Sequence, residues 1–219
     1  MRRRHFLTIT SASVGGMLIY TLQREPIRVS AQSQTLKIPL RFFTAHQALD
    51  ISAAAARIFP ADETGPGANE AGVTIYIDRQ LAGHYGKDAF RYSQGPYQSG
   101  VPEQGYQGKE TPREIYRQGL AKIAGLRNLA PEEQDSRLRA IEKSMFFNLL
   151  RTHTIEGMFC DPMHGGNIDR IGWQLIGFPG PRMSYYKEVD QFHGRAFRPE
   201  PASLEQVLGR KVRPSEDED

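Results

Sequence analysis

The chain has 219 residues, of which 39% are hydrophobic, and it contains 21 Gly and 14 Pro. This composition predicts a folded, loop-rich protein rather than a disordered one. The net charge of the chain is +3. Residues 1–31 contain five Arg and one Glu and so carry +4, which leaves −1 for the rest of the chain. Because the positive charge lies in residues 1–31, we exclude nucleic acid as a partner.

Residues 1–31 have the order of an export signal. The residues that match the R-R-x-F-L order of a twin-arginine signal are Arg3, Arg4, Phe6 and Leu7. The moderately apolar segment that follows, to about residue 22, is short for a stable transmembrane helix. Small residues then predict cleavage between Ala31 and Gln32, with an uncleaved anchor as the alternative.

A twin-arginine signal predicts that the protein is folded before it reaches the periplasm. That route transports folded proteins, often with a cofactor or a partner bound. Cys160 is the only cysteine, so an internal disulfide is excluded. The sequence also lacks a C-x-x-C-H haem attachment motif and the Cys set of an iron–sulfur cluster.

Two helices are expected early in the chain. Residues 44–59 form the first, because Thr44 and Gln47 have the spacing of a capping box and Pro60 stops the helix. Residues 73–85 form the second, with apolar side chains four apart on one face.

Residues 86–110 are predicted to be an extended arm rich in Gly, Gln, Tyr and Pro. A loop of this length in a compact domain is often a binding segment. The aromatic residues Tyr92, Tyr97 and Tyr106 provide apolar area that a partner would bury. A disordered insertion is the alternative interpretation.

Two further helices are expected before residue 160. Thr111 starts one that runs to about Leu126, with Pro112 in its first turn. Residues 131–159 form the longest helical pattern, which Asp161 and Pro162 end. The predicted apolar face of this long helix consists of Leu138, Ile141, Met145, Leu149 and Thr152.

The segment EGMFCDPMHGGNIDRIGWQLIGFPGP, residues 156–181, has two interpretations. Its Gly and Pro residues predict tight turns around apolar side chains, which suits either a partner interface or an ordinary core. The candidate interface residues in this segment are His164, Gly165, Gly166, Trp173, Phe178 and Pro179.

The alternative is a metal-dependent enzyme that stands alone in the periplasm. Its candidate ligands are His153, Glu156, Asp161, His164 and Asp169. These residues match no H-E-x-x-H spacing, and the one pair at helical spacing, His153 and Glu156, is half of what a di-iron bundle needs. A structural interpretation is therefore favoured: Asp161 caps a turn, Asn167 or Asp169 caps a helix, and His153 packs inside. A nucleophilic Cys160 is disfavoured because acidic and apolar neighbours raise the pKa of a thiol.

Two long motifs resemble the gluconate 2-dehydrogenase subunit 3 family. They are IFPADETGPGANEAGVTIYIDRQLAG and FFNLLRTHTIEGMFCDPMHGGNIDRIGWQLIGFPG, and the resemblance covers about residues 42–185. One departure is His164, at a position where the family carries a Tyr.

The resemblance implies a subunit without a cofactor of its own. FAD would lie in a large flavoprotein dehydrogenase subunit, and haem c in a c-type cytochrome subunit. The small subunit would support the large one and carry it through the twin-arginine translocase, and the complex would be membrane-associated in the periplasm.

The expected fold is mainly α, a single irregular helical domain with long Gly/Pro-rich loops and an extended arm. The expected boundaries are a signal peptide at 1–31, the helical domain at 32–200 and an acidic, partly disordered tail at 201–219.

Overall fold

A computed structural model describes residues 19–20, 26–27, 39–91, 95–98, 100–182, 186–197 and 199–209. The α-helices of this part are α2 (Ala45–Ile58), α3 (Val73–Ala82), α4 (His84–Lys87), α5 (Pro112–Leu120), α6 (Pro131–Arg139), α7 (Met145–Phe159), α8 (Ile171–Ile176), α9 (Tyr186–Phe192) and α10 (Leu204–Leu208). Short 3-10 helices are η2 (Pro102–Gln104), η3 (Ala121–Ile123), η4 (Leu126–Asn128), η5 (Pro162–His164) and η6 (Ile168–Arg170). The strands β1 (Ile19–Tyr20) and β2 (Pro26–Ile27) form one antiparallel pair.

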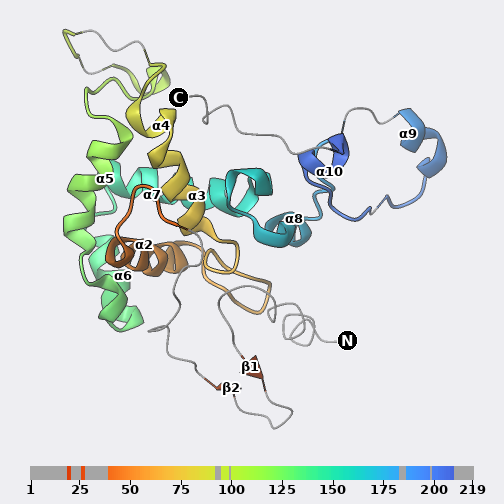
Figure 1. The fold of residues 1–219 in the computed structure, drawn as a ribbon, viewed down its shortest axis with the longest axis horizontal. Helices are drawn as coiled ribbons and strands as arrows, with labels where there is room; N and C mark the ends of the chain where they lie inside the picture. Colours follow the sequence, from red (N-terminus) through yellow and green to blue (C-terminus); the bar gives the residue numbers. More distant parts are fainter. Residues whose placement is uncertain are drawn as a thin grey trace.

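The expected mainly α fold is confirmed. Helix α7 packs against α2, α3 and α5, and we call α2–α7 the body (Figure 1). The buried apolar core lies between these helices and includes Ile51, Ile77, Leu81, Tyr116, Leu126, Leu150 and Met158. No helix among the described residues is both long and apolar enough to cross a membrane.

Helix α2 begins as the sequence predicts. Thr44 Oγ1 accepts a hydrogen bond from the Gln47 N–H, and the Gln47 side chain accepts one from the Thr44 N–H. The helix ends at Ile58, just before Pro60. Both capping partners therefore act through local contacts that the sequence spacing reveals.

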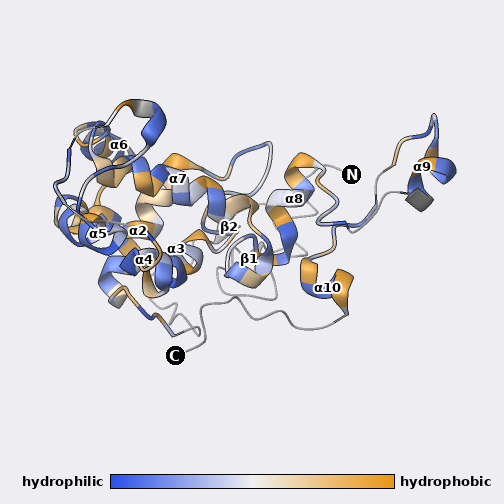
Figure 2. Cartoon of the chain, turned by 90° about the horizontal axis from the view of Figure 1, so that it is seen from above, coloured by the Kyte–Doolittle hydropathy of each residue, from blue (hydrophilic) through white to orange (hydrophobic). Residues whose placement is uncertain are grey.

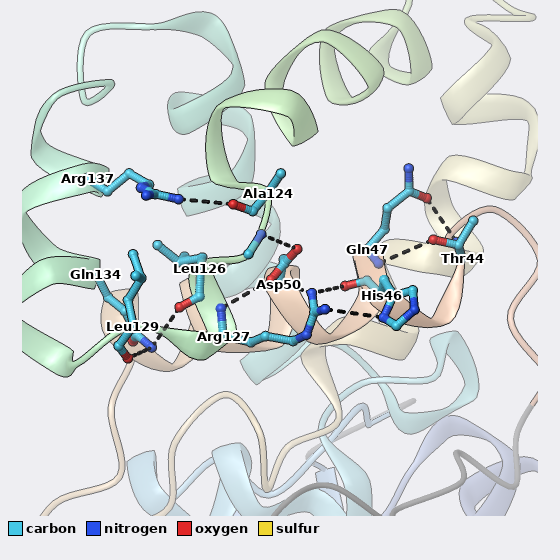
Figure 3. Close-up of polar contacts among 11 residues, drawn as sticks. Thr44, His46, Gln47, Asp50, Ala124, Leu126, Arg127, Leu129, Gln134 and Arg137 are labelled. Atoms are coloured by element: carbon cyan, nitrogen blue, oxygen red, sulfur yellow. Dashed lines mark hydrogen bonds and ion pairs between the residues drawn. The ribbon is translucent and has the colours of Figure 1, made fainter.

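Asp50 joins α2 to the segment around η4 (Figure 3). Its carboxylate accepts hydrogen bonds from the Gly125 N–H at 3.0 Å and the Arg127 N–H at 3.1 Å, and it pairs with the Arg127 guanidinium at 3.0 Å. Gln134 of α6 donates to the carbonyls of Leu126 and Leu129 on the same segment. A buried carboxylate thus fixes a turn that has no long helix of its own.

Asp78 plays the same part for the segment that leads into α2. Its side chain is 1% exposed and accepts three backbone N–H bonds. The donors are Arg41 at 2.7 Å, Phe42 at 3.0 Å and Phe43 at 2.8 Å. These bonds hold residues 41–43 against α3.

The expected single helix over residues 131–159 is wrong, because the structure has two helices, α6 and α7, joined by a turn at 140–144. Ser144 makes the break: its hydroxyl donates to the Ile141 carbonyl at 2.6 Å and accepts from the Phe147 N–H at 3.2 Å. A serine that bonds to nearby backbone in this way starts a helix rather than continuing one.

The expected apolar face is also wrong by one position in α7. Met145 and Thr152 are exposed. The buried residues of α7 are Phe146, Leu150, His153, Thr154, Gly157 and Met158. One residue is a rotation of about 100° around a helix, so the interior face is turned by that amount from the prediction.

Two other expected helices are shorter than predicted. The helix that begins at Thr111 ends at Leu120 rather than near Leu126, and the chain then passes through η3 to Gly125, whose φ of 76° is in the left-handed region that favours glycine. The expected helix over 73–85 ends at Ala82, and Gly83 separates it from α4.

Near its end, the described chain extends away from the body, and residues 202–204 then lie next to Pro179 and Asp161 again. We call residues 181–201, which include α9, the hook; Figures 1 and 2 both show α9 far from α2–α7. The hook closes at its base, where the Ala202 N–H donates to the Pro179 carbonyl at 3.2 Å and the Leu204 N–H donates to Asp161 at 2.7 Å. Helix α10 is therefore part of the folded chain although it follows the expected boundary at residue 200.

Candidate functional site

The turn that follows α7 is fixed by Asn167, which is fully buried. Its N–H and side-chain amide donate to the carbonyls of Gly157 and Cys160, both at 2.8 Å, and its side-chain oxygen accepts from the Gly172 N–H at 2.8 Å. Asn167 therefore gives the first turn of α8 a side-chain acceptor, as one of the two sequence alternatives expected, although the residue at the N-cap position is Arg170. Asp169 does not cap it, since Asp169 is exposed and only its backbone carbonyl accepts, from Gln174.

Two glycines let this turn close. Gly165 has a φ of 92°, a conformation that favours glycine. A Cβ on Gly166 would lie 2.3 Å from the Gly157 carbonyl oxygen, so no larger residue fits there. The glycine pair therefore serves backbone geometry in this chain.

Trp173 belongs to the interior. Its side chain is 3% exposed, its Nε1 donates to the Phe159 carbonyl at 2.7 Å, and its ring meets Phe178 edge-on at 5.2 Å. It therefore attaches α8 to the end of α7 and is almost wholly covered in the free chain. Phe178 itself is exposed, and Pro179 is half-buried.

The aromatic residues of the arm lie elsewhere on the molecule. Tyr97 and Tyr106 are exposed in the loop between α4 and α5, which Figures 1 and 2 show at the opposite end of the body from α8. Arg91 lies over the Tyr106 ring at 5.2 Å. The candidate interface residues that the structure describes thus fall into two separate groups, one on the arm and one around α8.

Several expected residues lie outside the described part of the chain. These are Tyr92, the signal residues Arg3, Arg4, Phe6 and Leu7, and the cleavage residues Ala31 and Gln32.

An open hollow of about 540 Å³ lies beside the end of α7. It is lined by Tyr76, Gln80, Ile155, Glu156, Phe159, Cys160, Asp161 and His164. The hollow combines apolar walls with two carboxylates and an imidazole, and it is our candidate functional site.

Burial raises the pKa of two groups that line the hollow, Tyr76 and Cys160. Tyr76 donates to Glu156 at 3.0 Å, and burial together with the Glu156 charge raises the pKa of the Tyr76 phenol. Burial, with a smaller contribution from Asp161, raises the pKa of the Cys160 thiol to about 12. The expectation that acidic and apolar neighbours raise the pKa of this thiol is therefore confirmed.

His153 lies in the interior beside the hollow, not in it. The Tyr85 hydroxyl is 2.8 Å from its Nε2 and the Tyr116 hydroxyl is 2.8 Å from its Nδ1. Burial lowers the pKa of His153 to about 4 and raises that of Tyr85 to about 12. The imidazole is neutral, so one tyrosine donates to it and the other accepts from it.

The five candidate metal ligands do not form one site. Glu156, Asp161 and His164 line the hollow, whereas His153 is bound between tyrosines and Asp169 is exposed. Among the described residues, no group of three or more His, Cys, Asp or Glu is placed to hold a metal ion.

Sequence reasoning missed the tyrosine partners of this region. Tyr76, Tyr85 and Tyr116 come from three different helices and meet α7 only in the folded chain. Their positions carry no spacing signal that marks them as hydrogen-bond partners of α7.

Comparison with known proteins places the chain in one family. No curated protein and no solved structure matches it. The model of the family described as gluconate 2-dehydrogenase subunit 3 matches residues 45–180, which run from the start of α2 through α8 and to the base of the hook. Because this match spans more than half of the chain, the protein belongs to the gluconate 2-dehydrogenase subunit 3 family.

Proposed function

We propose that this chain is the non-catalytic small subunit of a periplasmic, membrane-associated flavoprotein dehydrogenase complex that oxidises gluconate, another sugar or a polyol. It supports a large FAD-dependent subunit, and a c-type cytochrome subunit passes the electrons on. The family match over residues 45–180 carries this proposal.

The chemistry of the candidate site supports a supporting role. Cys160 is protonated because burial raises its pKa, and both nitrogens of His153 are occupied by tyrosine hydroxyls. Asn167 and Gly166 serve the backbone. His153 is thus held by tyrosines of α4 and α5, and the residues of the turn between α7 and α8 serve its backbone geometry.

We further propose that this chain takes the large subunit through the twin-arginine translocase as a passenger. The support is the order Arg3, Arg4, Phe6 and Leu7. A single signal on the small subunit then exports both chains after they have folded together.

The export proposal is tested by changing Arg3→Lys together with Arg4→Lys. We expect both this chain and the large subunit to remain in the cytoplasm, because Lys preserves the charge and removes the recognised pair. The measurement is cell fractionation with antibodies to both chains.

The matched control is Arg24→Lys with Arg28→Lys, which makes the same changes outside the motif. It should leave export intact. Arrival of the large subunit in the periplasm despite the changed Arg pair would disprove the passenger role.

We also propose that FAD and haem c belong to the partner subunits. Purified complex should contain flavin, and flavin should follow the large subunit when the chains are separated. Flavin or about one metal ion retained by the separated small subunit would contradict this assignment and favour the stand-alone enzyme.

A further inference from the structure

The hollow beside α7 has walls that suit a long side chain. Ile155 is 40% exposed and Phe159 is half-buried, and both line the hollow next to the Tyr76 ring. An unbranched stem packs well on such apolar surface while its polar end reaches water or a counter-charge.

The two carboxylates of the hollow have no cationic partner among the described residues. Arg79 of α3 lies against Gly165, the residue after His164, but it forms no ion pair with either carboxylate in the described part of the chain. Glu156 accepts one hydrogen bond, from the Tyr76 hydroxyl, and Asp161 accepts backbone N–H bonds from Met163 and Leu204. In the described part of the chain, no Lys or Arg lines the hollow or pairs with either carboxylate.

The Glu156 charge is also felt by groups around the hollow. It contributes, after burial, to the raised pKa of Tyr76, Tyr85 and Tyr116. These phenols are protonated and neutral, so they do not balance the Glu156 charge, and no described side chain that lines the hollow is a lysine or arginine that could do so.

We propose that the hollow receives a lysine or arginine side chain of the dehydrogenase subunit, whose stem packs on Ile155 and Phe159 and whose charged end pairs with Glu156. This inference rests on the proposed function, since it needs a partner subunit. It identifies the partner group by charge complementarity: an acidic, apolar-walled hollow fits a long cation.

Covering the hollow makes the cation necessary. Glu156 is exposed in the free chain, where water solvates it. A partner that buries this surface removes the water, and a carboxylate that loses water without gaining a cation opposes binding. The paired cation therefore sets where the partner docks as well as how tightly.

The test is Glu156→Gln, measured as the dissociation constant between the purified full chain and the dehydrogenase subunit at low and at physiological ionic strength. Gln keeps an acceptor for the Tyr76 hydroxyl and removes the charge, so the fold is preserved. We expect binding at least tenfold weaker, with a shallower salt dependence than the wild type.

The matched control is Glu142→Gln. Glu142 is an exposed acid on the turn between α6 and α7, away from the hollow. It should bind like the wild type at both ionic strengths. A uniform charge effect, equal in both variants, would overturn the proposal.

The remaining outcomes separate the two ideas. Equal binding by wild type and Glu156→Gln overturns the cation site and leaves the proposed function standing, whereas no binding by the wild type overturns both. Residues 1–31 of this chain are another basic candidate. If trypsin cleaves the free Glu156→Gln variant at Arg24 and Arg28 faster than it cleaves the wild type, and binding to the dehydrogenase subunit is unchanged, then this basic segment fills the hollow and the proposal is wrong.

Discussion

Two buried carboxylates hold loops to helices through backbone N–H groups. Asp50 fixes the segment around Gly125, and Asp78 fixes residues 41–43. Each carboxylate gives partners to donors that would otherwise be unsatisfied in the interior. At the scale of the residue, these two acids stabilise the fold by accepting backbone hydrogen bonds, and we assign them this role rather than a catalytic one.

Asp78→Ala should lower the free energy of unfolding by roughly 3 kcal/mol or more, because three backbone N–H groups lose their acceptor in a buried place. The measurement is equilibrium unfolding by denaturant. Asp78→Asn is the matched control, since its side-chain oxygen still accepts part of the set, and it should cost less. A loss for Asp78→Ala no larger than for Glu142→Gln would contradict this account.

His153 should make stability depend on pH. Its pKa is about 4 in the fold because of burial, against about 6.5 for an unfolded His, so between these values the unfolded chain binds a proton that the native chain does not. Its contribution is complete above about pH 6.5 and is lost as pH falls towards 4, by roughly 3 kcal/mol in all.

The check compares wild type with His153→Gln, whose amide still offers a donor and an acceptor to the two tyrosines. Unfolding free energies measured between pH 7 and pH 5 should fall more steeply for the wild type. Parallel curves for the two proteins would show that His153 does not titrate in this way.

Helix starts could be predicted from sequence, whereas helix breaks could not. The Thr44 and Thr111 caps depend on contacts within four residues, which a sequence displays. The break before α7 depends on the hydrogen bond from the Ser144 hydroxyl to the nearby Ile141 carbonyl. The buried face of α7 depends on which helices surround it. In the candidate site, Asn167 could be predicted as a cap, but the hollow joins α3 to α7 and so required the fold.

Gly119 lies at a close approach between α5 and α7. A Cβ there would lie 2.0 Å from the Phe146 ring, so Gly119→Ala should destabilise the protein by about 1–3 kcal/mol through overpacking. In an open helix the same change would stabilise by up to about 1 kcal/mol, so the sign decides between the two cases.

The companion variant is Phe146→Leu, which shortens the opposing side chain. Adding Gly119→Ala to Phe146→Leu should cost less than adding it to the wild type, and the difference is the coupling measured by a double-mutant cycle. Additive costs in the unfolding free energy would mean that the two residues do not meet.

At the scale of the whole molecule, the body and the hook are stabilised by separate sets of contacts. The body has the shared core of α2–α7. The hook has a small cluster of its own, in which Arg182 pairs with Glu188 and lies over Phe197, whose ring meets Phe192. The turn after α7 links the two, because Asp161 binds α10 and Trp173 binds α7 to α8.

Trp173→Ala should therefore reduce how much complex assembles without changing how fast each assembled complex works. Removing a buried aromatic side chain costs roughly 3–5 kcal/mol, a large part of a typical stability of about 5–15 kcal/mol. A supporting subunit sets the amount of catalyst, whereas a catalytic residue sets its rate. Trp173→Phe is the matched control, since it keeps most of the buried ring and loses only the bond from Nε1 to Phe159.

The measurement is dehydrogenase turnover divided by the flavin content of purified complex, together with complex yield. We expect yield to fall in the order wild type, Trp173→Phe, Trp173→Ala, and turnover per flavin to stay constant. Intact yield with turnover per flavin lowered a hundredfold, about 2.7 kcal/mol of activation free energy, would mean that the end of α7 and α8 takes part in the reaction. The small subunit would then act in catalysis, because loss of the Trp173 ring would have changed the chemical step while assembly stayed complete.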